Sequence, residues 1–171
     1  MRTARRVYLY AVSFISLQAV MWAAIAGGRL LLLFREVSAT YAQVIAGSLA
    51  ILIVGVPFFL IHWLTARRLA LADSEERGSA FRAFFHYALM ASTSIPALLS
   101  ILEAIHTLIS RALGIADPWS FFGPAEPLSG HLLEAAITGA VWVFAWRQAA
   151  TDAHAIPEAG NRASLHRLYR Y

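Results

Sequence analysis

Residues 37–66, VSATYAQVIAGSLAILIVGVPFFLIHWLTA, form an uninterrupted run without a charged side chain. A helix needs about 20 apolar residues to cross the roughly 30 Å of hydrocarbon in a bilayer. A charge-free run of this length therefore predicts a membrane-spanning helix. Three further apolar segments lie around it, and together the four segments predict spans at 7–33, 42–65, 82–110 and 129–147.

The composition of the whole chain points to the same class. Hydrophobic residues make up 59% of the 171 positions and charged residues only 14%, whereas a soluble domain is nearer half apolar and a quarter charged. A small soluble core cannot enclose so much apolar side chain. We therefore expect an all-α transmembrane four-helix bundle over residues 1–150, followed at 151–171 by a linker and a short basic amphipathic juxtamembrane helix.

The arginines predict how this bundle is oriented. Eleven of the fourteen basic residues fall at the N-terminus, in the connection between the second and third spans, or in the tail: Arg2, Arg5, Arg6, Arg67, Arg68, Arg77, Arg82, Arg147, Arg162, Arg167 and Arg170. Because positive charge is retained on the cytoplasmic side, both termini are expected to be cytoplasmic in a bacterial inner membrane. Membrane-flanking charge also explains the basic composition, so we do not expect nucleic-acid binding.

The chain also repeats itself. Residues 77–87, RGSAFRAFFHY, align without gaps with residues 161–171, NRASLHRLYRY, and the end of the second span (54–63) matches the end of the fourth (137–146). Such self-similarity is typical of membrane proteins built from repeated units. We interpret the bundle as two tandem two-helix hairpins, each beginning with Arg and aromatic residues and ending with Trp.

Three of these segments together resemble a known family. They are Arg-Arg-x-Tyr-x-Tyr at 5–10, Gly-x-Pro-x-x-x-x-His-Trp at 55–63 and Asp-x-Glu-Glu-Arg-x-Ser-Ala-x-Arg at 73–82. The chain is similar in them to the bacterial multi-pass membrane family catalogued as domain of unknown function 5671. That family has no established activity, so the resemblance implies fold and topology. The second unit departs from the pattern, since Ala145 stands where His62 precedes Trp in the first.

Two histidines form the first candidate site. His62 and His86 lie near the same predicted membrane face on consecutive helices. Facing imidazoles in a bundle can ligate haem iron or a chlorin magnesium. The alternative is a pair of interfacial histidines whose polar edges turn to water.

Glu103, His106, His131 and Glu134 form the second candidate site. Each Glu lies three positions from a His, on the third and fourth spans respectively, so each pair shares one helix face near the outer interface. Facing Glu and His side chains can build a dimetal carboxylate site or a Zn²⁺ site. The alternative is a set of Glu–His hydrogen bonds that cap the helix ends.

No catalytic motif or phosphate-binding loop is recognisable, and the absence of cysteine excludes thiolate chemistry. The leading hypothesis is a non-enzymatic scaffold or accessory subunit that packs in the bilayer against other membrane proteins, or against itself, through small-residue and aromatic faces. The second is a redox, metal-binding or tetrapyrrole-binding membrane protein that uses the histidines and glutamates above. The third is a small-solute transporter with a cavity near Gln43 and Ser92.

Overall fold

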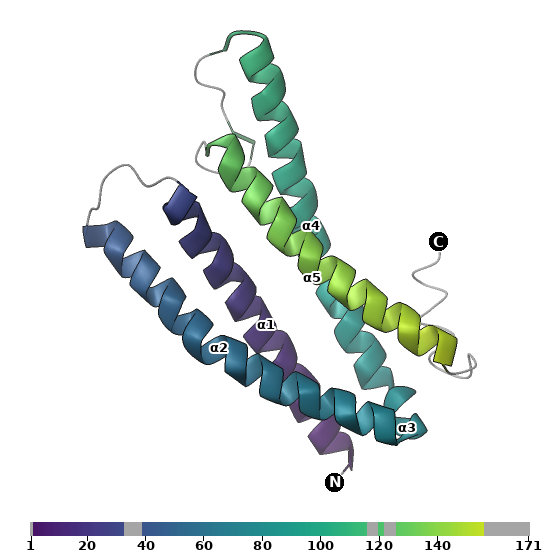
Figure 1. Ribbon diagram of the computed structural model, residues 1–171. Coiled ribbons are helices and arrows are strands. Elements are labelled where there is room, and N and C mark those ends of the chain that lie inside the picture. Colours follow the sequence, from purple (N-terminus) through teal and green to yellow (C-terminus); the bar gives the residue numbers. More distant parts are fainter. Residues whose placement is uncertain (1, 33–38, 116–119, 122–125, 156–171) are drawn as a thin grey trace.

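The computed structural model is helical wherever it shows regular structure, and it describes residues 2–32, 39–115, 120–121 and 126–155. The helices are α1 (Arg2–Leu32), α2 (Ala39–Ala72), the short α3 (Ser74–Arg77), α4 (Ala80–Ala112) and α5 (Leu128–Ala155) (Figure 1). Four of them are long and apolar enough to cross a membrane. The predicted all-α bundle is therefore confirmed. The juxtamembrane helix expected in the tail lies outside the described residues.

The long helices form two hairpins, α1 with α2 and α4 with α5, and α3 lies in the connection between them (Figure 1). α1 joins the hairpins, because it packs against α2 on one side and contacts α4 and α5 on the other. We call the end of the bundle that contains α3 the α3 end, and the opposite end the loop end. The pairing agrees with two consecutive hairpin units, whereas their origin as a sequence repeat stays a prediction.

Small residues set the close packing of α1 on α2. A Cβ added at Gly27 would lie 3.0 Å from the Cβ of Ser48, and one added at Gly55 would lie 2.9 Å from a methyl group of Val20. Glycine at both positions therefore lets the two backbones approach. Helices in lipid use such small-residue contacts because lipid leaves no hydrophobic drive between them.

The core of the bundle lies at the α3 end and is aromatic. Trp63 of α2 stacks on Phe85 of α4 with ring centroids 5.5 Å apart, and it meets Phe144 of α5 edge-on at 5.3 Å. Offset and edge-to-face geometries are those that aromatic pairs prefer. Ala145 of α5 is completely buried in the same cluster. An imidazole at this position would displace its neighbours, which gives a packing reason for Ala145 where the first unit has His62.

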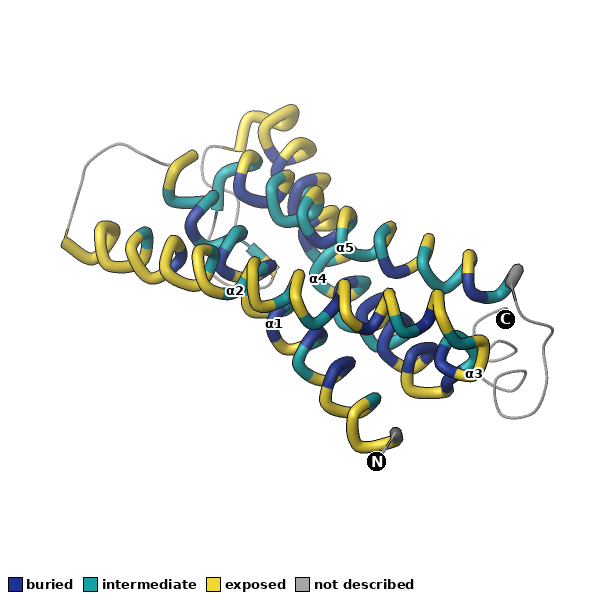
Figure 2. Tube along the Cα trace, turned by 60° about the horizontal axis from the view of Figure 1, so that its bottom comes forward, coloured by how far each residue is buried: buried dark blue, intermediate teal, exposed yellow. Residues whose placement is uncertain are grey.

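α2 stands out because almost all of its surface is exposed (Figure 2). Only Ser48, Trp63, Ala66 and Ala70 are buried along its 34 residues, and in its most apolar window only 6% of the positions are buried. An exposed apolar surface of this extent is incompatible with water. Lipid or another membrane helix must therefore cover it.

Candidate functional site

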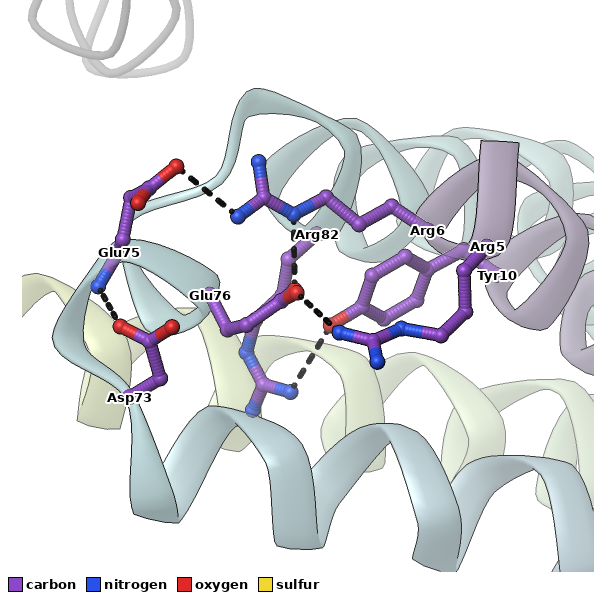
Figure 3. A network of polar contacts seen from close by, with 7 residues as sticks. All are labelled: Arg5, Arg6, Tyr10, Asp73, Glu75, Glu76 and Arg82. Atoms are coloured by element: carbon purple, nitrogen blue, oxygen red, sulfur yellow. Dashed lines mark hydrogen bonds and ion pairs between the residues drawn. The ribbon is translucent and has the colours of Figure 1, made fainter. Parts of the chain in front are cut away.

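Two polar clusters lie at opposite ends of the bundle, and the first joins α1 to α3. Glu76 is buried between two arginines of α1: Arg5 donates to one carboxylate oxygen at 3.0 Å, and Arg6 donates to the other at 2.9 Å (Figure 3). Asp73 caps α3 by accepting a hydrogen bond from the backbone N–H of Glu75. This cap fixes the short helix that presents Glu76, as side-chain oxygens at helix starts commonly do.

A second ion pair lies deeper at the same end. Arg82 of α4 donates a hydrogen bond of 2.5 Å to Asp152 of α5, and both side chains are more than nine-tenths buried. The guanidinium also lies 5.6 Å from the centroid of the Trp63 ring, within the range of a cation–π contact. Arg82 therefore links α4, α5 and α2 at one point.

The position of Asp152 differs from the sequence interpretation. The expected linker begins at residue 151, but α5 continues to Ala155 and carries Asp152 into the core. The helix can extend because Arg82 compensates the carboxylate, whose burial alone would be costly. Apart from Asp73, which caps α3, every charged side chain named here at the α3 end has an oppositely charged partner. We interpret this cluster as a set of structural ion pairs that hold the helices together rather than as a catalytic or binding site.

The two histidines of the first predicted site have different surroundings. His62 lies against Tyr8 and Phe58, and its Nδ1 is 2.8 Å from the backbone oxygen of Phe58. His86 is completely buried, with Nδ1 3.7 Å from an Asp152 oxygen and its ring beside Trp63. The geometry gives no support to a cofactor held between the two imidazoles, and this site stays a prediction.

The loop end contains a cavity of about 450 Å³ between α1, α4 and α5. Its polar lining comes from α1, from α4, from the connection between α4 and α5, and from α5. Apolar residues of α1 and α4 complete the wall. The polar lining is Arg29, Ser100, Glu103, Ser120, Glu126, His131 and Glu134, and the apolar lining is Trp22, Ile95, Pro96 and Leu99.

Arg29 organises the charges of this cavity. Its guanidinium forms an ion pair with Glu134 of α5 and a second one, at 3.1 Å, with Glu126. Glu103 is buried and accepts a hydrogen bond of 2.8 Å from Ser120. The described lining therefore places three carboxylates and one guanidinium in a partly buried space, where charges interact more strongly than in water.

Three of the four predicted metal ligands, Glu103, His131 and Glu134, line this one cavity. The fourth, His106, lies beside Ser110 and packs edge-on against Phe121, with ring centroids 4.8 Å apart. Within the described part of the chain, no three His, Asp or Glu side chains are gathered closely enough to hold a metal ion. Metal binding by these four residues stays a prediction.

Sequence reasoning missed Arg29, Glu126 and Asp152. Arg29 and Glu126 belong to no predicted site: Arg29 follows the first uncharged segment, and Glu126 lies between the third and fourth predicted spans. One signal was present: Arg29 directly follows an uncharged span, and Glu134 lies within another apolar segment, so each needs a partner. Which two would meet depends on how the hairpins dock, and no local pattern encodes that.

The comparisons agree with the sequence resemblance. The model of the family described as Domain of unknown function (DUF5671) matches residues 6–123, which extend from the start of α1 beyond the end of α4. No curated protein and no solved structure matches the chain.

Proposed function

We propose that this chain, which belongs to the DUF5671 family, is a non-enzymatic scaffold or accessory subunit that packs through α2 against another membrane-spanning helix. The observation that supports the proposal is the nearly complete exposure of α2, of which 6% is buried in its most apolar window. Over most of its length α2 packs against α1, and at the α3 end its Trp63 also reaches α4 and α5. The side of α2 that faces away from α1 has no neighbour among the described helices.

The residue types on that side favour a protein neighbour over lipid. Lipid tails contact large apolar side chains well, whereas small residues at a surface favour helix–helix contact because they let backbones approach. The exposed side of α2 has a small residue at every third or fourth position near the loop end. We call these residues the small-residue face: Ala39, Ala42, Ala46, Gly47 and Ala50.

Two details support this interpretation. A Cβ added at Gly47 would meet nothing within 4 Å, so glycine at this position serves no contact with the described residues. Gln43 lies exposed beside the face and makes no hydrogen bond within the described residues. An amide in a membrane span gains from a hydrogen-bond partner on a neighbouring helix. A partner helix on the small-residue face would supply both contacts.

The mass of the complex extracted in a mild detergent tests the proposal. Gly47→Leu fills the small-residue face and leaves contacts within the chain intact, so we expect a folded protein that has lost its partner. Ala91→Leu adds a side chain of the same size at an exposed position of α4 and serves as the matched control. Equal masses for wild type, Gly47→Leu and Ala91→Leu would contradict the proposal.

The proposed orientation places the α3 end in the cytoplasm of a bacterial cell. Among the described arginines, eight lie at that end (Arg2, Arg5, Arg6, Arg67, Arg68, Arg77, Arg82 and Arg147), whereas Arg29 and Arg111 lie at the loop end. This asymmetry supports an inner-membrane protein with both termini in the cytoplasm. The loop end would then face the outside.

A metal protein is the second candidate, because Glu103, His131 and Glu134 line one cavity. Elemental mass spectrometry of purified protein distinguishes it from the scaffold. A near-stoichiometric metal that disappears in His131→Ala would replace the scaffold proposal. Metal-free, folded protein would remove this candidate.

A further inference from the structure

The cavity at the loop end has a charge that selects its ligand. Among the described residues that line it, Glu103, Glu126 and Glu134 supply three carboxylates and Arg29 supplies one guanidinium. Arg29 forms ion pairs with Glu126 and Glu134. Among these four charged side chains, negative charge exceeds positive charge by two. A partly buried space with this excess attracts a cation and repels an anion.

Two acceptor groups in the cavity have no hydrogen-bond partner within the part of the chain that the structure describes. His131 is 7% exposed and lines the cavity, yet its ring makes no hydrogen bond or ion pair within the described residues. One carboxylate oxygen of Glu126, Oε2, is buried and accepts no hydrogen bond from the same part of the chain. Buried polar groups are normally paired, and an orphaned group calls for an explanation. A ligand with several N–H donors would satisfy both.

The apolar part of the cavity wall indicates that the cationic ligand is organic. Trp22, Ile95, Pro96 and Leu99 form an apolar side next to the acceptors. A volume of about 450 Å³ lies within the range of small-molecule sites, which typically combine apolar walls with a few placed polar groups. The indole of Trp22 can also face a cation through its ring.

We propose that this cavity binds a primary ammonium group attached to an apolar body. Such a group carries one positive charge and three N–H donors, the number that a lysine ammonium has. The acceptors available to it are Glu126 Oε2 and a ring nitrogen of His131, and the charge of Glu103 adds attraction. Two kinds of ligand carry such an ammonium group: a free amine, and the headgroup of phosphatidylethanolamine at the membrane interface.

The first experiment uses phenethylammonium chloride as the probe. It is titrated by calorimetry into detergent-purified protein, and 2-phenylethanol, which has a neutral hydroxyl in place of the ammonium, is the matched control ligand. We expect saturable binding of the ammonium compound and at least tenfold weaker binding of the alcohol. Glu126→Gln keeps the shape of the side chain and removes its charge, so it should weaken binding at least tenfold.

The second experiment tests the lipid source. Delipidated protein is mixed with phosphatidylethanolamine, with its N-acetyl derivative, or with phosphatidylglycerol, and retained lipid is counted by native mass spectrometry. Preferential retention of phosphatidylethanolamine that is lost in Glu126→Gln would identify the headgroup as the ligand. Glu75→Gln, at an exposed carboxylate of the α3 end, is the control and should leave retention unchanged.

Support requires a preference for the ammonium compound in at least one experiment, with loss in Glu126→Gln. Three results would overturn the proposal: no preference in either experiment, equal binding of phenethylammonium and 2-phenylethanol without a lipid preference, or unchanged binding in Glu126→Gln. The comparison of ligands on the wild-type protein decides the matter even if a variant fails to fold. Neither experiment depends on the packing of α2, so their results do not test the scaffold proposal, which has its own experiments.

Discussion

Arg82 near the start of α4 donates a hydrogen bond of 2.5 Å to Asp152 near the end of α5, and both side chains are buried. The two residues are 70 positions apart in the chain. Their pairing closes the second hairpin at the α3 end, beneath the ring of Trp63. Because removal of one member leaves the other charge buried and uncompensated, the pair makes the strongest prediction about stability.

Asp152→Asn should lower the free energy of unfolding by about 3 kcal/mol, the usual cost of breaking a buried ion pair from one side. Unfolding in detergent with added dodecyl sulfate, followed by circular dichroism, measures this loss. Glu75→Gln is the control, because the Glu75 side chain is 66% exposed and its ion pair with Arg6 lies at the surface. A loss below about 0.5 kcal/mol for Asp152→Asn, as for an ordinary surface substitution, would show that the Arg82–Asp152 pair does not stabilise the bundle.

The ion pair between Arg29 and Glu134 should couple α1 to α5 at the loop end. In a double-mutant cycle, the combined loss in Arg29→Ala/Glu134→Ala should be smaller than the sum of the two single losses by about 1 kcal/mol or more. The same unfolding titration supplies the four free energies. Losses that add to within about 0.4 kcal/mol would mean that the two side chains do not interact in the folded protein.

The proposed orientation predicts which ends react with a membrane-impermeant maleimide. Since the chain has no cysteine, single substitutions give unambiguous labelling. Leu113→Cys, at the loop end, should react in intact cells, and Leu71→Cys, at the α3 end, should react only after the cells are opened. Both positions are exposed in the structure. The reverse labelling pattern would mean that the protein has the opposite orientation in the membrane.

The extent of what sequence could predict differs between the fold and the site. The charge-free run at 37–66 and the three other apolar segments were sufficient to predict the four long helices, because the thickness of the bilayer fixes the length of a span. The predicted spans fall inside the observed helices, except that residue 33 lies outside the described residues. The helices extend further at the α3 end, where ion pairs such as Arg82–Asp152 compensate the charges.

The candidate site was only partly predictable. Three of its acidic and imidazole residues, Glu103, His131 and Glu134, were found because polar groups in apolar segments are conspicuous. Arg29 and Glu126 were not predicted as site residues. The sequence around a charge at the end of a span does not show whether the charge faces water or pairs with another residue. The docking of α1 against α5 decides that, and it is a tertiary event that depends on close contacts such as Gly28 against Leu133.

The central claim is that α2 has a protein neighbour on its small-residue face, and photo-crosslinking in living cells tests it most directly. p-Benzoylphenylalanine replaces Ala46 on that face or, as the control, Ile105, an exposed residue of α4 at a similar distance from the loop end. We expect a discrete protein adduct from position 46 and none from position 105. An adduct with twice the mass of the chain would identify a second copy as the neighbour, and any other discrete mass a different protein. Lipid adducts alone at both positions would contradict the account, because lipid would then cover α2.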